Sequence, residues 1–354
     1  MSVLPRYVAT LCPGFEDVVC LEIGERLPGA KVVGTDLGRI LFDDAGDPAE
    51  LLRLRSVNHL SVFIGEIIDL AADEGGLSQL ERLGEDLDFD PALSILARVR
   101  DLPDGLPSFR VTGERVGTHA FTSQQAAAHL GGGIVRARGW PVSLKGYDVE
   151  FRLAIAGSHA WVGVALTRVS LHRRGGIVPG RAPLKATVAY GLVRLLDPQP
   201  GDIVVDPMCG TGTALVECAQ HCPEAIVIGG DVDDRALGSA GDRMAQTGTL
   251  AACVRWDARH LPLRYQSVDR LVCNLPFGRR VGSHHSNRHL YPGFVRELRR
   301  VLRPGGRAVL LTAERRLLER LLVRECGLRV TVQRNVNLSN LHAVLYIVEG
   351  TTSA

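Results

Sequence analysis

The second half of this 354-residue chain alternates short apolar runs with stretches of helical periodicity, which limits the folds open to it. The runs lie at 203–206, 226–231, 251–256, 268–273 and 307–313. Strands that alternate with helices in this way form a parallel, doubly wound sheet. The last two apolar runs, 328–338 and 341–348, lie too close together for a crossover helix. They are expected to form an antiparallel hairpin that closes the sheet.

A glycine-rich turn follows the first of these strands, where residues 206–213 read Asp-Pro-Met-Cys-Gly-Thr-Gly-Thr. A doubly wound sheet binds ligands at the carboxyl ends of its strands, beside the point where the strand order reverses. Gly210 and Gly212 allow the backbone to approach such a ligand closely. A dinucleotide-binding turn needs a third small residue three positions after Gly212, and this chain has Leu215 there. A nicotinamide dinucleotide is therefore disfavoured.

Acidic residues stand at three successive strand ends, and their order fits S-adenosylmethionine. Asp206 would receive the ammonium of the methionine part, Asp231 the two ribose hydroxyls, and Asp257 the adenine amino group, with the Ala258 N–H donating to the ring. Each aspartate alone could be a helix cap or a solvated residue, but the three together favour the cofactor. The candidate cofactor-binding residues in this part of the chain are Asp206, Gly210, Gly212, Thr213, Asp231, Val232, Asp257, Ala258 and Asn274.

The fourth strand ends in Asn274-Leu275-Pro276-Phe277. The exocyclic amine of a nucleobase is a poor nucleophile, because its lone pair is delocalised into the ring. The Asn274 side-chain carbonyl and the Leu275 backbone carbonyl can accept its two N–H groups and orient the lone pair towards a methyl donor. Pro276 would fix the turn and Phe277 would stack on a base that has left its helix. The same four residues could instead form an ordinary turn beside a core phenylalanine. Because the motif follows a cofactor site, a catalytic role for all four residues is favoured.

Charge is distributed unevenly along the chain. Residues 1–97 have a net charge of −11 and residues 98–354 a net charge of +13, and only three of the 41 cations are lysine. A GC-rich genome would explain the preference for arginine but not its segregation. Arginine suits phosphate, so a polyanionic partner is favoured for the later part of the chain. Residues 279–288, which begin with Arg279 and Arg280 and end with Arg288, read as a basic loop beside the expected catalytic turn, where a nucleic-acid backbone would pass.

Four segments are predicted. Residues 1–70 read as a small α+β domain, 71–95 as an acidic linker with a helix and a loop, 96–176 as a second domain, and 177–354 as the doubly wound domain. The second domain contains a helix over 123–138, with Ser123 as its expected N-cap. The eight cysteines form no CxxC pair and no metal-ligand spacing, so we expect reduced thiols and no metal.

Residues 181–350 resemble the class I methyltransferases that make N2-methylguanosine in RNA. The similarity is carried by the stretches 181–185, 206–213 and 274–278. The last of these corresponds to the family's (Asn/Asp)-Pro-Pro-(Phe/Tyr) motif, with Leu275 in place of the commonest proline, as in the tRNA branch. The resemblance implies a Rossmann-like fold, S-adenosylmethionine as cofactor, and Ala182, Pro183 and Leu184 packed under its methionine end.

The middle of the chain resembles a THUMP domain at residues 109–111, 115–123 and 166–174. In that family this domain and a preceding ferredoxin-like domain bind the CCA end of tRNA, which is the implied function here. The candidate RNA-binding residues are Arg110, Arg115, His119, Arg136, Arg168, Arg173, Arg279 and Arg280.

These observations together predict an α/β protein that methylates N2 of a guanosine in the tRNA acceptor stem, at nucleotide 6. An rRNA guanosine-N2 methyltransferase remains as an alternative, although such proteins are usually longer. A non-catalytic RNA-binding protein and a DNA adenine methyltransferase are less favoured, the first by the intact acids and Asn274, the second by the THUMP resemblance. No signal peptide and no bilayer-spanning run is seen, so a cytoplasmic location is expected. The protein is also expected to be a monomer.

Overall fold

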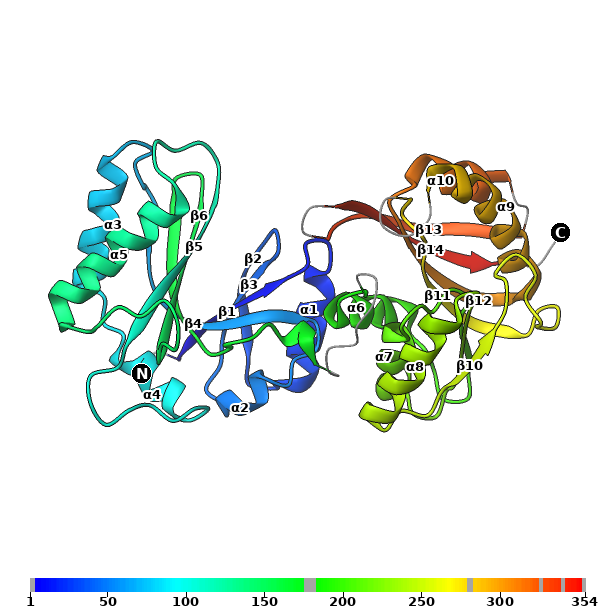
Figure 1. The fold of residues 1–354 in the computed structure, drawn as a ribbon, viewed down its shortest axis with the longest axis horizontal. Coiled ribbons are helices and arrows are strands. Elements are labelled where there is room, and N and C mark those ends of the chain that lie inside the picture. The colour runs from blue at the N-terminus through cyan, green and yellow to red at the C-terminus, as the bar shows by residue number, and fades with distance from the viewer. Residues whose placement is uncertain (1–3, 175–182, 279–282, 325–326, 339–340, 352–354) are drawn as a thin grey trace. The chain divides into compact units, whose positions relative to one another are not determined.

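The computed structural model describes residues 4–174, 183–278, 283–324, 327–338 and 341–351 (Figure 1). The chain divides into two compact units. The first contains Val19–Leu171 and the residues up to Thr10, and the second contains Leu11–Val18 and the residues from His172 onward. The second unit is therefore built from two separate stretches of the sequence.

The first unit is built on a seven-stranded sheet with the order β2-β3-β1-β4-β7-β6-β5. Its strands are β1 (Arg6–Leu11), β2 (Lys31–Asp36), β3 (Arg39–Asp43), β4 (Val57–Ile67), β5 (Phe109–Val116), β6 (Val149–Ala156) and β7 (His159–Ala165). β4 pairs antiparallel with β7, so strands from the two predicted N-terminal segments lie in one sheet. The helices of this unit are α1 (Glu16–Arg26), whose first three residues belong to the second unit, α2 (Pro48–Leu51), α3 (Gly75–Asp86), α4 (Asp90–Ala97) and α5 (Ser123–Arg138).

The acidic segment 71–95 forms α3 and the start of α4, and α3 packs closely on α5. The two backbones approach at Gly84 and Gly133, since a Cβ added at Gly84 would lie 3.2 Å from the Gly133 Cα. The segment is thus part of the helical layer. The helix predicted at 123–138 is confirmed, but the predicted cap was wrong. Thr122 is the N-cap, with its hydroxyl accepting from the Gln125 N–H in a capping box, because Ser123 already has helical geometry.

The second unit contains a seven-stranded sheet with the order β10-β9-β8-β11-β12-β14-β13. Its strands are β8 (Ile203–Asp206), β9 (Ile226–Asp231), β10 (Ala252–Arg255), β11 (Val268–Asn274), β12 (Leu302–Thr312), β13 (Leu328–Asn337) and β14 (His342–Gly350). The first five are parallel, and β13 and β14 form the predicted antiparallel hairpin, with β14 also antiparallel to β12. The strand order reverses between β8 and β11, which makes their carboxyl ends the expected ligand site.

The α-helices that the structure describes beside this sheet are α6 (Ala186–Leu196), α7 (Thr213–His221), α8 (Asp234–Thr247), α9 (His284–Val301) and α10 (Arg315–Arg324). Apolar side chains of α9 and α10 join those of β11, β12 and β14 in one buried cluster, so these helices pack against the sheet. This packing fixes the ends of β11 and β12, beside which the predicted catalytic turn lies.

Residues 11–18 pack on the rest of the second unit at two places. The Phe15 ring fills the space beside Gly191 of α6, where an added Cβ would lie 2.6 Å from it. At β13, both terminal nitrogens of Arg334 bind the Asp17 carboxylate, at 2.7 and 2.9 Å. The Asn337 N–H also donates to the Pro13 carbonyl over 3.1 Å. This short N-terminal segment therefore contributes both core and polar contacts to the unit.

Within the described ranges, no helix has the length and apolar character needed to cross a membrane. Those ranges also contain no group of three or more His, Cys, Asp or Glu side chains that could hold a metal ion.

Candidate methyl-transfer site

Asp206 ends β8 and is almost fully buried, with 2% of its surface exposed. Its carboxylate accepts from the Met208 N–H at 3.1 Å. Burial raises the pKa of Asp206 to about 8, and the nearby negative charge of Asp231 acts in the same direction. A buried carboxylate that resists ionisation is a site where a bound cation would be strongly favoured.

The glycine turn after Asp206 needs its glycines. Gly210 and Gly212 have φ angles of 53° and 73°, in the left-handed region that other residues rarely adopt. Gly212 also packs against α8, where an added Cβ would lie 2.9 Å from the Ala240 Cβ. Thr213 follows as the first residue of α7, and its buried hydroxyl has no hydrogen-bond partner among the described residues. The turn therefore presents a polar group that a ligand could satisfy.

Asp231, at the end of β9, holds this turn from the other side. Its two carboxylate oxygens accept from the N–H of Gly210 at 2.9 Å and from that of Asp233 at 3.1 Å. Each oxygen keeps a further lone pair for a ligand hydroxyl. The Trp256 indole packs against Gly230 and donates to the Pro207 carbonyl over 3.0 Å, which braces the turn further. Neither Trp256 nor the bond to Gly210 was predicted from the sequence.

The third acid of the series has an internal partner. Asp257 lies two residues after β10, and its carboxylate binds the Arg259 guanidinium, with Nη2 at 2.6 Å and Nε at 3.0 Å. These contacts lower the pKa of Asp257. Of the other predicted cofactor residues, Ala258 is buried and Val232 is 60% exposed. Pro183 and Leu184 lie just before α6, and Ala182 falls outside the described residues.

Asn274 is the last residue of β11, on the other side of the switch point. The register pairs Leu271 with Val205 of β8, so Asn274 extends beyond the end of β8, towards the level of the glycine turn. Its side-chain carbonyl oxygen is buried and has no hydrogen-bond partner among the described residues. A buried acceptor left unpaired costs about 1–3 kcal/mol, so its retention indicates a functional position.

The turn after Asn274 is anchored by α9. The Pro276 carbonyl accepts from the Asn287 side-chain amide and from the Tyr291 hydroxyl, each at 2.8 Å. Tyr291 accepts in turn from the Thr312 hydroxyl at 2.8 Å, since its own proton goes to Pro276. The sequence assigned Tyr291 to core packing and placed Asn287 in the basic loop before the helix, whereas α9 already begins at His284. Their spacing of four residues, which places both on one helix face, was the available signal.

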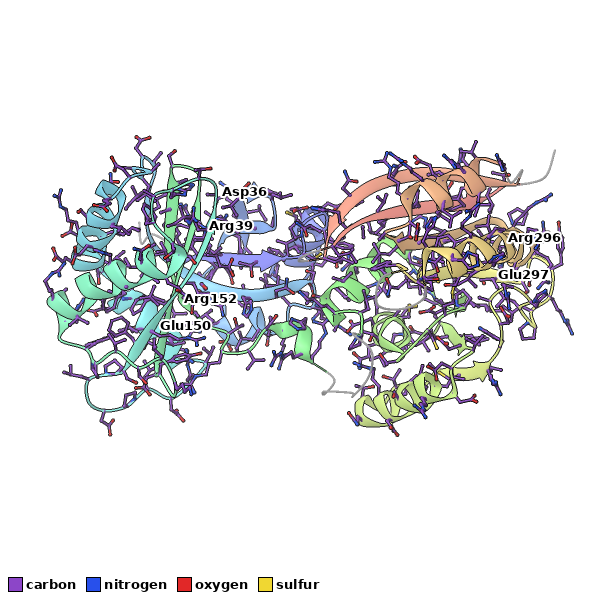
Figure 2. All side chains as sticks on the ribbon, turned by 45° about the horizontal axis from the view of Figure 1, so that its top comes forward. Asp36, Arg39, Glu150, Arg152, Arg296 and Glu297 are labelled. Atoms are coloured by element: carbon purple, nitrogen blue, oxygen red, sulfur yellow. The ribbon has the colours of Figure 1, made fainter. Side chains whose placement is uncertain are left out.

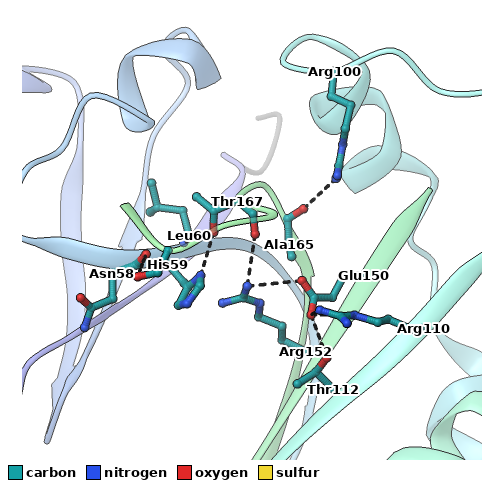
Figure 3. A network of polar contacts seen from close by, with 11 residues as sticks. Asn58, His59, Leu60, Arg100, Arg110, Thr112, Glu150, Arg152, Ala165 and Thr167 are labelled. Carbon is teal, nitrogen blue, oxygen red and sulfur yellow. Dashed lines mark hydrogen bonds and ion pairs between the residues drawn. The ribbon is translucent and has the colours of Figure 1, made fainter. Parts of the chain in front are cut away.

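The predicted RNA-binding residue Arg110 has partners inside the first unit. Figure 3 shows its guanidinium bound to the buried Glu150 carboxylate, with Nη2 at 2.7 Å and Nε at 3.1 Å. Arg152 and Thr112 bind the same carboxylate, at 3.3 and 2.7 Å. Burial raises the pKa of Glu150, but Arg152, Thr112 and Arg110 outweigh it and lower that pKa overall. Figure 2 labels Glu150 and Arg152 within this unit.

Most of the other predicted RNA-binding residues also have internal partners. Arg115 contacts the Gly117 carbonyl at 2.8 Å and the His119 ring at 3.1 Å. Arg136 binds Glu81 and Glu85 at 2.6 and 2.5 Å, and Arg168 donates to the Tyr147 carbonyl at 3.3 Å. Arg173, in the second unit, is exposed and has no such partner within the described part of the chain. Arg279 and Arg280 lie outside the described residues.

Comparisons with known proteins agree with this arrangement. A THUMP domain model matches residues 91–165, and an RMKL-like methyltransferase domain model matches residues 177–344. The tRNA (guanine(6)-N2)-methyltransferase of Thermus thermophilus is 37% identical over 317 residues, covering 89% of this chain and 91% of that protein. The crystal structure of TrmN from Thermus thermophilus has a TM-score of 0.81 and 34% identity, covering 98% of this chain and 99% of its own.

A mouse protein, tRNA (guanine(6)-N(2))-methyltransferase THUMP3, is 36% identical over 312 residues, which cover 83% of this chain. The chain spans little more than half the length of this mammalian relative, 58%, and 52% of the human one. The fold and the residues at its strand ends define a class I methyltransferase linked to a THUMP domain. The chain belongs to the family of THUMP-containing tRNA guanine-N2 methyltransferases, as predicted from the sequence.

Proposed function

We propose that this chain transfers a methyl group from S-adenosylmethionine to N2 of a guanosine in the tRNA acceptor stem, at nucleotide 6. The observation that carries the proposal is the buried, unpartnered carbonyl oxygen of Asn274 at the switch point of the sheet. The similarity to the Thermus thermophilus enzyme, whose name specifies guanine 6, supports the position. The protein would act as a monomer in the cytoplasm, where tRNA is processed.

The residues at the strand ends fit the cofactor. S-adenosylmethionine supplies a methyl group activated by the positive charge on its sulfur. Asp206 would lose its proton and pair with the ammonium, while the unpaired Thr213 hydroxyl offers a further polar contact. The remaining lone pairs of Asp231 suit the ribose hydroxyls. Asp257 and Ala258 are proposed for the adenine, in which case Asp257 would bind its amino group alongside Arg259.

The catalytic turn would then act on the target base by orientation. The Asn274 side-chain oxygen and the Leu275 carbonyl accept the two N–H groups of the amine, which directs its lone pair towards the methyl group. The amine nitrogen would form its bond to the methyl carbon as the carbon–sulfur bond breaks, with that electron pair staying on sulfur. The methylated amine, now positively charged, would then release one proton to water. Phe277 would provide a stacking surface for the base. Because Asn287 and Tyr291 hold the Pro276 carbonyl, they keep these acceptors in place.

The THUMP domain over residues 96–176, with the ferredoxin-like residues 1–70 before it, is proposed to hold the CCA end of tRNA. Among the predicted contacts, exposed Arg173 is the stronger candidate for a phosphate, while Arg110 and Arg136 brace the domain through Glu150, Glu81 and Glu85. Removing CCA from the tRNA should strongly lower activity. Equal activity on tRNA with and without CCA would contradict this binding mode and favour an rRNA substrate.

Mass spectrometry of nucleosides tests the reaction itself. Transcribed tRNA incubated with the protein and S-adenosylmethionine should contain N2-methylguanosine, and a transcript with adenosine at nucleotide 6 should not. Methylation of rRNA without methylation of tRNA would support the alternative substrate. Binding of tRNA without methyl transfer to any RNA would support a non-catalytic RNA-binding role.

A further inference from the structure

A basic groove lies beside the methyl-transfer site, between the start of α9 and the helix α10. Its volume is about 1110 Å³. Five arginines and two glutamates are among the residues that line it: Arg288, Arg315, Arg316, Arg320, Arg324, Glu314 and Glu319. Arg288 is the last residue of the basic loop predicted from the sequence, and the other six residues were not singled out there.

The two acids of the groove have partners close by. The Glu314 carboxylate faces the His284 ring, with Nδ1 at 2.9 Å, and Glu319 pairs with Arg315 at 3.6 Å. The remaining arginines are exposed, and the described residues provide no ion-pair partner for them. The positive charge of the groove is therefore left available to a ligand from solution.

Three of these arginines form a stripe along α10. Arg316, Arg320 and Arg324 are spaced by four residues, so they share one face of the helix with a rise of about 6 Å per step. This separation resembles that of successive phosphates along a nucleic-acid strand. Like charges at this spacing weaken an isolated helix by a few tenths of a kcal/mol per pair. The spacing of these arginines therefore costs α10 some stability, and it matches the spacing of charges on a polyanion.

The groove adjoins the catalytic turn. Gly278 follows Phe277, and a Cβ added there would lie 2.9 Å from the Glu314 carboxylate and 3.0 Å from the His284 N–H. Both of these residues line the groove. In addition, Arg288 follows Asn287, which holds the Pro276 carbonyl. A strand whose base occupies the catalytic turn would thus have its neighbouring phosphates beside the arginines.

We propose that this groove binds the phosphodiester backbone of the RNA next to the methylated guanosine. The proposal rests on the proposed function and identifies how that site holds its substrate. Extrusion of a base from a duplex costs a few kcal/mol, and phosphate contacts on the same strand would offset part of that cost. Such contacts position the RNA without reading its sequence. They would also make RNA affinity strongly dependent on salt.

The experiment compares two charge-reversal variants of the full chain in tRNA binding by fluorescence anisotropy at several KCl concentrations. Arg316→Glu with Arg320→Glu alters the groove. Arg264→Glu with Arg296→Glu makes the same charge change elsewhere in the second unit, at exposed positions outside the groove. Arg264 lies in the loop before β11, at the end of that strand away from Asn274, and Figure 2 labels Arg296 on α9.

We expect the groove variant to bind tRNA at least tenfold more weakly, with the slope of log affinity against log salt reduced by about two. S-adenosylmethionine affinity should not change, and the control variant should retain both the tRNA affinity and the slope. Arg316→Gln with Arg320→Gln, together with thermal melting, separates loss of charge from loss of fold, and it should also reduce the slope.

A wild-type salt slope in both groove variants, or an equal loss in the control, would overturn the proposal. The proposed function is tested separately, because nucleoside analysis measures methyl transfer whereas the binding experiment measures only the role of the groove. If the wild-type protein bound tRNA through these arginines but methylated no RNA, the proposed methyl transfer would be contradicted, while RNA binding at the groove would stand.

Discussion

The backbone N–H of Gly210 donates to the carboxylate of Asp231 over 2.9 Å, which joins the glycine turn after β8 to the end of β9. Asp231 thereby has two proposed tasks, to shape the turn and to accept ribose hydroxyls. A residue that both shapes a site and contacts its ligand should be sensitive to small changes in its side chain.

Asp231→Ala is expected to weaken S-adenosylmethionine binding by about 1–3 kcal/mol, since a charge-assisted contact and a turn contact are lost together. Asp231→Asn keeps one carbonyl acceptor and should lose less. Isothermal titration calorimetry measures both values. Unchanged affinity in the alanine variant would exclude Asp231 from the cofactor site.

Cofactor affinity should depend on the ionisation of Asp206, whose pKa is raised to about 8 by burial. Below that pH the carboxyl group holds a proton that must leave before it can pair with a cation. Affinity should therefore rise as the pH increases towards 8, by up to tenfold per unit. Calorimetry in buffers of different ionisation enthalpy should detect the released proton. Asp206→Asn should bind more weakly and lose this pH dependence, and a pH-independent wild type would contradict the assignment.

Asn274→Ala should reduce turnover about 100-fold or more while tRNA and cofactor affinities stay nearly unchanged, because the lost acceptor acts on the reacting amine. Single-turnover methylation assays with saturating protein measure this effect. Phe277→Ala should also slow the reaction, through loss of stacking worth about 1–3 kcal/mol. Wild-type turnover in Asn274→Ala would mean that the chemistry occurs elsewhere.

Tyr291→Phe tests whether α9 positions the catalytic turn. The substitution removes one hydrogen bond to the Pro276 carbonyl and leaves the one from Asn287. A net loss of about 0.5–1.5 kcal/mol corresponds to a turnover roughly two- to tenfold lower. A purely structural role would lower the melting temperature without changing turnover at a temperature where the protein is folded.

Arg110→Ala should act on stability before it acts on RNA. It leaves the buried Glu150 carboxylate with fewer partners, so the free energy of unfolding should fall by about 1–3 kcal/mol. Urea denaturation measures the loss. Arg173→Ala, at an exposed position, is the matched control, which should lower tRNA affinity with little effect on stability. If Arg110→Ala left stability unchanged but weakened tRNA binding, Arg110 would be a tRNA contact and not a brace of the domain.

The polar residues at the strand ends of the second unit could be predicted, because each one directly follows an apolar run in the sequence. Asp206, Asp231 and Asn274 each end a strand, and a parallel sheet brings the ends of its strands to one edge. The hairpin of β13 and β14 was predictable from the short interval between two apolar runs. In each case the relevant information lies within a few residues of the position concerned.

Partners distant in the sequence were not predictable in the same way. Arg110 and Glu150 are 40 residues apart, and their pairing follows from the parallel register of β5 and β6. Asp257 meets Arg259 only two residues away, but the orientation of both side chains depends on the turn. The arginine stripe of α10 was visible as a spacing of four, yet nothing local indicated a groove beside it.

The packing of residues 11–18 on the second unit has a consequence for how the enzyme can be divided. A fragment that begins at residue 172 would lack Phe15, leaving the space at Gly191 open, and Arg334 would lose the Asp17 carboxylate. The catalytic half is thus not a module that one cut can release. Chimeras between relatives would need three crossover points, two flanking residues 11–18 and one near the middle of the chain, to exchange the second unit intact.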